Sequence, residues 1–266
     1  MGASGVAKAA TVFGAGGQLG YAVAAVLAER GWRVSALRHE QVDVADLPQV
    51  EEALRVARPD LVVNCAGVLR HKFQEREGEG WAVNAYAPAA IGLALERCSL
   101  TSVPYVHVGS LMSTRPVDRY SWSKWLGELA VKAAYAEARI VQVEWVYGTE
   151  GHNENWVLRV LQRARSGQPV SAVRGRVSPC YTYAFAGAVE ALAQLPPGLY
   201  AFGPEPVEIR EALQTLMGVA GLNVEVGLQE EITDTLHGVS SPVVQCPPLR
   251  ESLEDYLRRC PDAWRA

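Results

Sequence analysis

Three glycines spaced three residues apart, Gly14, Gly17 and Gly20, join two apolar segments near the start of the chain. Residues 10–13 before them are typical of a buried strand, and the alanine-rich residues 19–29 are typical of a closely packed helix. Glycines in such a turn let the backbone approach a pyrophosphate at the helix N-terminus. A plain glycine-rich turn has the same spacing, so the flanking strand and helix favour a dinucleotide loop. Its predicted cofactor-binding residues are Gly14, Gly17, Gln18, Leu19 and Gly20.

Strand-like and helix-like segments alternate through the first half of the chain. We expect strands at 10–13, 33–37, 61–64, 106–108 and 140–143, with helices at 19–29, 47–58, 83–97 and 120–138. Asp46 is the expected N-cap of the second of these helices. Such alternation implies right-handed crossovers and predicts an α/β fold with a Rossmann-like, doubly wound parallel sheet.

The pattern loosens after about residue 148, where prolines interrupt shorter elements. We therefore expect an NAD(P)-binding Rossmann domain over 1–150 and a smaller substrate-binding lobe over 151–266. Part of that lobe, about 174–194, is expected to pack back on the sheet. The substrate cleft would lie at the carboxyl ends of the strands, between the sheet and the lobe.

Cofactor preference depends on the end of the second strand. An acid there would bind the ribose 2′-hydroxyl of NADH, whereas an arginine accommodates the 2′-phosphate of NADPH. The chain has Arg38 at this point and no acid until Glu40, so NADPH is favoured over NADH, although a solvated strand-end arginine is the alternative. Further along, Asp43 and Val44 would flank the adenine. The predicted residues beneath the nicotinamide half are Cys65, Ala66 and Gly67.

Tyr120 and Lys124 are four residues apart in a predicted helix and so lie on one helix face. The ammonium there can favour the phenolate, lowering a phenol pKa that is otherwise near 10. Such a phenol can pass a proton to a substrate oxygen while a hydride moves at the neighbouring carbon. The alternative is an exposed helix with an amphipathic Tyr and a solvated Lys.

Charge and cysteine content exclude several other functions. A net charge of −4 with a pI near 5.8 gives no indication of a nucleic-acid or anionic-membrane surface. The apolar runs are too short for a membrane span, and no secretory signal is evident. Five scattered cysteines without a C-x-x-C pair, and equally dispersed histidines, predict no disulfide framework, no metal site and a cytoplasmic location.

Together these motifs resemble the extended short-chain dehydrogenase/reductase superfamily and, within it, the dTDP-4-dehydrorhamnose reductase family. The resemblance is carried by residues 58–66 (RPDLVVNCA), 83–85 (VNA), 120–124 (YSWSK) with Gly127-Glu128, 145–148 (WVYG), Asn155-Trp156 and Ser178-Pro179.

The resemblance implies roles for five residues. Tyr120 would be the proton donor, and Lys124 would bind the nicotinamide ribose while favouring the phenolate. Ser110 would polarise the substrate carbonyl, with Ser113 as a nearby alternative and ordinary turn chemistry as another. Asn84 would brace the catalytic site. Trp145 would lie against the substrate, unless it is a core residue.

The chain also departs from the family. Gly109-Ser110-Leu111 stands where relatives have S-T-D, the segment from Ser110 to Tyr120 is shorter, and Ser240-Ser241-Pro242 replaces an Arg-Arg-Pro motif. The cofactor half is unaffected by these changes, which bear on the choice of substrate.

The leading hypothesis is an NADPH-dependent reductase of a small-molecule keto group, such as a nucleotide-linked 4-keto-deoxysugar or a related biosynthetic carbonyl intermediate. One alternative is a nucleotide-sugar epimerase or dehydratase that retains its cofactor. Another is a non-catalytic NADP-binding regulatory subunit, like the beta subunits of methionine adenosyltransferase. A homodimer is one assembly that the sequence leaves open.

Overall fold

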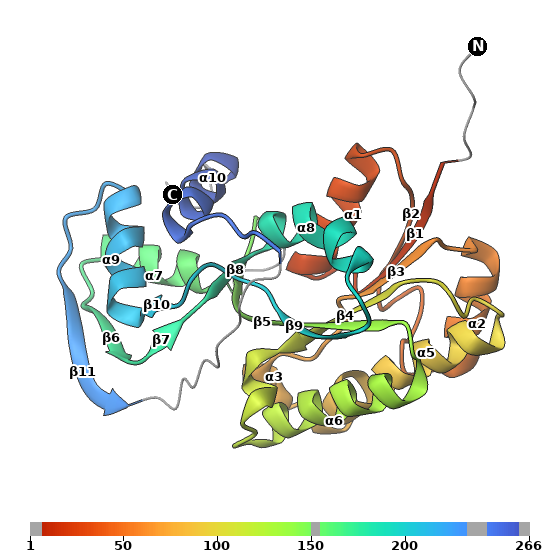
Figure 1. Cartoon of the computed structure of the whole chain (residues 1–266). Helices are drawn as coiled ribbons and strands as arrows, with labels where there is room; N and C mark the ends of the chain where they lie inside the picture. The colour runs from red at the N-terminus through yellow and green to blue at the C-terminus, as the bar shows by residue number, and fades with distance from the viewer. Residues whose placement is uncertain (1–6, 150–154, 233–243, 261–266) are drawn as a thin grey trace, which may run out of the picture.

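A parallel β-sheet with helices on both faces forms the larger part of the molecule (Figure 1). The structure, a computed structural model, describes residues 7–149, 155–232 and 244–260. The strand order is β2-β1-β3-β4-β5-β8, and β9 also pairs with β5. The strands are β1 (Ala9–Phe13), β2 (Arg33–Leu37), β3 (Leu61–Asn64), β4 (Tyr105–Ser110), β5 (Ala138–Tyr147), β8 (Pro179–Tyr181) and β9 (Gly198–Ala201).

The strand order reverses between β1 and β3, because the chain passes from β1 to β2 on one side and then returns to β3 on the other. The carboxyl ends of β1 and β3 therefore meet at one edge of the sheet, where doubly wound proteins place their ligands. The predicted α/β class with a Rossmann-like parallel sheet is confirmed.

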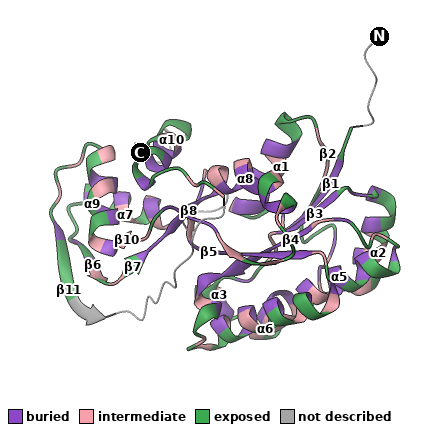
Figure 2. Cartoon of the chain, in the orientation of Figure 1, coloured by how far each residue is buried: buried purple, intermediate pink, exposed green. Residues whose placement is uncertain are grey.

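Two sets of helices cover the sheet and bury its central strands β1, β3 and β4, which are purple in Figure 2, whereas the outer strands β2 and β9 are partly exposed. Helices α1 (Gln18–Glu29) and α8 (Thr182–Gln194) pack together on one face. Helices α2 (Leu47–Ala57), α5 (Ala87–Arg97) and α6 (Arg119–Ala134) cover the other. Asp46 caps α2 as expected, its carboxylate accepting a hydrogen bond from the Gln49 amide.

Most of the elements that follow β5 form a lobe beside the sheet, around a third apolar cluster (Figure 1). They are α7 (Trp156–Arg165), β6 (Val170–Arg174), β7 (Arg176–Val177), β10 (Val207–Glu208), α9 (Ile209–Val219), β11 (Val226–Ile232) and α10 (Leu249–Arg259). Between β7 and β10 the chain returns to the sheet as β8, α8 and β9. It thereby contributes a strand beyond the expected 174–194 segment.

Two predicted helices have different boundaries in the structure. The 120–138 helix ends at Ala134, because Tyr135 leaves the helix and is buried, its hydroxyl donating to the Leu100 and Val103 carbonyl oxygens at 2.7 Å. The 83–97 helix is a π-helical turn, η1 (Ala82–Tyr86), followed by α5. Pro88 has no amide hydrogen for the Asn84 carbonyl, and a π-turn accommodates that missing bond.

Within the described residues, none of the helices has both the length and the apolar character needed to span a bilayer. The same residues contain no grouping of three or more His, Cys, Asp or Glu side chains suited to a metal ion.

Candidate active site

The glycine loop turns from β1 into α1 and lies against the loop that follows β3. Gly14 has a φ of 75°, and a Cβ there would be 2.5 Å from the Ala66 amide nitrogen. A Cβ on Gly20 would be 2.3 Å from the Gly14 carbonyl oxygen, so both positions require glycine. A Cβ on Gly17 would make only an ordinary contact at 3.5 Å. Packing within the protein therefore does not require glycine at position 17, and its lack of a side chain leaves the N-terminus of α1 open.

The first two residues of α1, Gln18 and Leu19, follow the glycine loop and differ in what they can present to a ligand. Leu19 is buried in the core between α1 and the sheet, so only its backbone amide can face a phosphate. Gln18 is half-buried, and its side-chain oxygen has no hydrogen-bond partner among the described residues. Gly17 has no side chain with which to cap the helix. The N-terminal amides of α1 are thus suited to an anion.

Arg38 lies at the end of β2, beside the glycine loop. Its Cγ is 3.6 Å from the Cβ position of Gly16, its side chain is exposed, and it makes no ion pair with a described residue. The guanidinium is therefore placed to meet an anion carried at the rim of the loop. Asp43 binds the Ala45 amide at 2.9 Å, and the Val44 side chain is buried in the core, which leaves its backbone for contact with a ligand.

Asn84 ties the loop after β3 to helix α6. Its amide accepts from the Val68 amide at 2.9 Å and donates to the Val68 carbonyl at 3.0 Å and the Ser123 hydroxyl at 3.2 Å. Cys65, Ala66 and Gly67 precede Val68, and Gly67 lies between Asn84 and Lys124. Burial raises the pKa of the Cys65 thiol to about 12, so this thiol is not a nucleophile.

A second asparagine, Asn64 at the end of β3, also holds the loop that follows this strand. The Asn64 side-chain oxygen accepts the Ala66 amide at 3.0 Å, so its nitrogen faces the Tyr105 hydroxyl and His107 Nδ1, both at 3.3 Å. Nδ1 of His107 is therefore the acceptor, and the ring proton sits on Nε2. Burial lowers the pKa of His107 well below its usual value.

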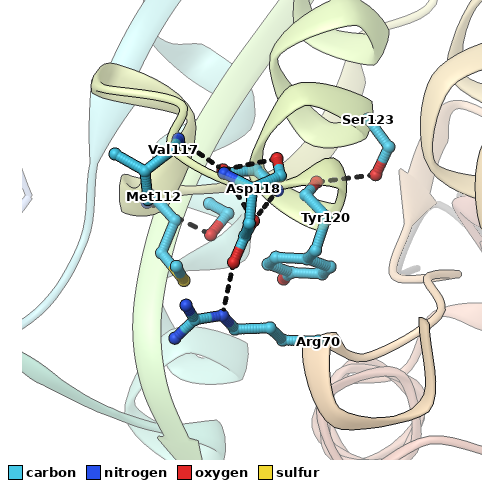
Figure 3. Close-up of polar contacts among 8 residues, drawn as sticks. Arg70, Met112, Val117, Asp118, Tyr120 and Ser123 are labelled. Atoms are coloured by element: carbon cyan, nitrogen blue, oxygen red, sulfur yellow. Dashed lines mark hydrogen bonds and ion pairs between the residues drawn. The ribbon is translucent and has the colours of Figure 1, made fainter. Parts of the chain in front are cut away.

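Helix α6 begins at Arg119, one residue before Tyr120, and its N-terminus is held by a capping residue. Asp118 is its N-cap: it accepts from the Ser121 amide at 2.8 Å in a capping box, and it pairs with the Arg70 guanidinium at 2.7 Å (Figure 3). Burial would raise the pKa of Asp118, but these bonds hold it below its usual range. Arg70 belongs to α3 (Arg70–Phe73), which follows the loop after β3. The Arg70–Asp118 pair therefore joins this part of the chain to the start of α6, beside Tyr120.

Ser110 ends β4, and its hydroxyl lies near enough to the Tyr120 phenol to lower the pKa of that phenol. The Ser110 hydroxyl oxygen accepts the Met112 amide at 3.3 Å, which caps the short helix η2 (Leu111–Thr114). Ser113 instead donates to Glu128 at 2.7 Å within the protein. The structure thus brings Ser110 to Tyr120, whereas the Ser113 hydroxyl is committed elsewhere.

Lys124 is one turn beyond Tyr120 and is buried, with its ammonium donating to the Val108 carbonyl oxygen at 3.1 Å. Burial lowers the pKa of Lys124, and the nearby Glu128 carboxylate opposes this. Burial also raises the pKa of Tyr120, and the nearby Ser110 hydroxyl is the main opposing influence. The expected lowering of the Tyr120 pKa by Lys124 was therefore wrong, because desolvation is larger and Lys124 is engaged with Val108.

Trp145 occupies an irregular point in β5. Its φ is 44°, unusual for a bulky residue, where the pairing between β5 and β8 shifts register. Its carbonyl accepts the Trp156 indole N–H at 2.9 Å, and the two rings are 5.2 Å apart. Trp145 is half-buried, so part of the ring remains accessible.

Three supporting groups were not foreseen: Glu128, the Arg70–Asp118 pair and the Asn64–His107 pair. Glu128 had a local signal, because Tyr120, Lys124 and Glu128 follow one another at four-residue intervals on a single helix face. Arg70 and Asp118 are 48 residues apart in the chain, and no local pattern connects them. The late Ser240-Ser241-Pro242 motif lies outside the described residues.

Comparison with known proteins gives consistent matches. A family model described as the RmlD substrate binding domain matches residues 9–197. The spore coat polysaccharide biosynthesis protein SpsK of Bacillus subtilis is 31% identical over 206 residues, covering 71% of each chain. The dTDP-4-dehydrorhamnose reductase of Mycolicibacterium smegmatis is 31% identical over 203 residues, covering 69% of this chain but 60% of that one.

A solved structure extends the match to nearly the whole chain. The dTDP-4-dehydrorhamnose reductase from Bacillus anthracis, in complex with NADP, has a TM-score of 0.84 and 19% identity. It covers 96% of this chain and 99% of its own. At this identity the likeness establishes the fold.

Proposed function

The chain belongs to the RmlD substrate-binding domain family of extended short-chain dehydrogenases/reductases, and we propose that it is an NADPH-dependent reductase of a keto group. The observation that carries the proposal is the nearness of Ser110 to Tyr120, one helical turn before the buried Lys124, whose ammonium lies beside Gly67 in the loop after β3. A nucleotide-linked 4-keto-deoxysugar or a related biosynthetic carbonyl intermediate is the proposed substrate. The relatives' names as dTDP-4-dehydrorhamnose reductases support this class.

The residues present fit a dinucleotide. Gly14 and Gly20 let the loop turn tightly from β1 into α1, where a Cβ would collide with neighbouring backbone, and the α1 amides suit the pyrophosphate of the dinucleotide. Arg38 would take the 2′-phosphate of NADPH, and the NADP in the Bacillus anthracis structure supports this preference. Residues 65–67 would lie beneath the nicotinamide half. NADPH, when bound, supplies the hydride for the carbonyl carbon.

The protein's own side chains would control the oxygen. Ser110 would donate its hydroxyl proton in a hydrogen bond to the carbonyl oxygen, which stabilises the charge that develops there. Tyr120 would protonate that oxygen, and its raised pKa keeps the phenol protonated at neutral pH, as a proton donor requires. Lys124 would bind the nicotinamide ribose, Asn84 would hold the loop that faces it, and Trp145 would contact the substrate.

Two alternatives make different forecasts. An epimerase or dehydratase would return the hydride and release no NADP+ in proportion to product. A regulatory subunit would transfer no hydride at all. The retention of Ser110, Tyr120 and Lys124 weighs against the regulatory subunit, and release of NADP+ in proportion to product would weigh against the epimerase or dehydratase.

The test is NADPH oxidation against a panel of keto-sugar nucleotides and small ketones. Tyr120→Phe removes only the hydroxyl, so NADPH binding should survive while reduction falls by about 10²-fold or more. Ser110→Ala should lower the rate without weakening cofactor binding, whereas Lys124→Ala should damage both. A Tyr120→Phe protein as active as wild type, on a substrate that is turned over, would contradict the mechanism.

A homodimer and a cytoplasmic location stay predictions. Helix α6 exposes Trp122, Leu126 and Leu129 along one stripe, and such an apolar stripe supports a second copy as its cover. Light scattering of the purified protein should give twice the monomer mass, and Leu126→Glu should restore the monomer.

A further inference from the structure

A buried carboxylate lies directly behind Ser110 and is part of no role assigned so far. Glu128, on α6, is 7% exposed. Its Oε1 accepts the Ser110 backbone amide at 3.0 Å, and its Oε2 accepts the Ser113 hydroxyl at 2.7 Å and the Gln142 side-chain nitrogen at 2.8 Å. Three donors from η2, β4 and β5 thus converge on one side chain.

The neighbouring backbone is shaped around this carboxylate. A Cβ on Gly109 would be 2.4 Å from Glu128 Oε1, so the strand can reach Glu128 only with glycine at this position. The hydrogen bond to Ser110 therefore fixes the backbone at the last residue of β4. The chain turns into η2 immediately afterwards, and the direction of the Ser110 hydroxyl depends on that turn.

Burying a charge is costly unless hydrogen bonds compensate it. Burial raises the pKa of Glu128, and the bonds from Ser110, Ser113 and Gln142 oppose this. Core packing alone would be served better by an apolar side chain, so the carboxylate has another use. Its oxygens accept a backbone amide on the strand that carries Ser110, and its helix carries Tyr120 two turns earlier.

We propose that Glu128 is a positioning residue that fixes the Ser110 hydroxyl against Tyr120 by accepting the Ser110 amide. The inference rests on the proposed reductase function for its kinetic consequences, but not for its geometry. What matters is the reach of the side chain, because the acceptor must stand 3.0 Å from the Ser110 nitrogen while a second polar atom meets Ser113 and Gln142.

Two substitutions separate reach from charge. Glu128→Gln keeps the length and an oxygen for the Ser110 amide, and its new amide group can meet Gln142 after that side chain rotates. Glu128→Asp keeps the charge but withdraws the acceptor by one carbon–carbon bond. We expect kcat to fall between about 10- and 100-fold in the Asp variant, with Gln within a few-fold of wild type and the NADPH dissociation constant unchanged in both.

A double-mutant cycle excludes general damage. If Glu128 acts through Ser110, Glu128→Asp should cost little further kcat in a Ser110→Ala background. Glu190→Asp is the control, because Glu190 is likewise a carboxylate that accepts hydrogen bonds, two in its case, from Arg30 at 2.7 Å and Trp32 at 2.9 Å on the α1–α8 side of the sheet. It should lower stability and leave kcat unchanged.

An Asp variant that is more active than Gln, or losses that multiply in the Ser110→Ala background, would overturn the inference. If the wild-type protein oxidises no NADPH, the proposed function fails, and crystal structures of the two variants decide the role of Glu128. The Ser110 hydroxyl should then keep its place beside Tyr120 in the Gln variant and move away from it in the Asp variant. An unchanged Ser110 hydroxyl in the Asp variant would refute the positioning role independently of turnover.

Discussion

Replacing His107 by Gln tests whether a neutral imidazole supports Asn64 and, through it, the loop after β3. The ring is fully buried, its Nδ1 accepts from Asn64, and its Nε2 has no partner among the described residues. Burial holds its pKa well below the usual value. The unfolded chain therefore takes up a proton below a pH of about 6.5, while the native ring does not. The contribution of the neutral His107 ring to the free energy of unfolding is therefore fully present above that pH and is lost as the pH falls below it.

The size of the effect follows from proton linkage. While the native ring stays neutral, lowering the pH from 7.5 to 5.5 costs about 1.4 kcal/mol of unfolding free energy. His107→Gln removes this titration, and the Gln oxygen can still accept from Asn64. Urea unfolding of both proteins at the two pH values gives the difference, from which the other histidines cancel. An equal loss in both proteins would show that the native imidazole is protonated, and the reasoning would be wrong.

Two further predictions concern the cofactor and the packing of α6. Arg38→Ala should weaken NADPH binding about tenfold and leave NADH binding nearly unchanged, measured by fluorescence titration with Arg33→Ala as control; equal affinities of wild type for both cofactors would contradict it. Gly127→Ala should destabilise the protein by about 1–3 kcal/mol, because its Cβ would be 2.0 Å from the Asn84 carbonyl oxygen. Thermal unfolding checks this against Gly218→Ala, whose Cβ meets nothing within 4 Å and which should stabilise α9.

The sequence predicted the family, the sheet and the elements whose signals are local. The strands at 33–37 and 61–64 and the Asp46 cap were confirmed, because apolar runs and a capping residue determine them directly. The predicted end of the 120–138 helix was wrong. The helix stops at Ala134 because the Tyr135 hydroxyl binds two carbonyl oxygens that belong to residues more than 30 positions earlier in the chain. Strand β9 is short and half-exposed, so nothing in residues 198–201 marks them as part of the sheet.

The candidate site shows the same division. The positions of Gly14, Tyr120 and Lys124 follow from motifs, whereas the partners that fix them come from distant segments. Arg70 with Asp118 and Asn64 with His107 meet only when β3, β4 and α6 are assembled. The pKa of Tyr120 depends on burial, which spacing alone cannot supply. The roles of the site residues stay predictions.

The path of the chain through β8, α8 and β9 limits how this protein could be recombined with its relatives. The described part of the lobe comes from both sides of a piece of the sheet, from residues 155–177 before it and from residues 207–232 and 244–259 after it. A fragment that stops at residue 150 would leave β5 without its outer neighbours and α1 without α8, including the Arg30–Glu190 pair. A chimaera made by a single crossover near residue 150 would therefore exchange β8, α8 and β9 together with the lobe. Exchanging the lobe alone requires inserts on both sides of a retained 178–206 segment.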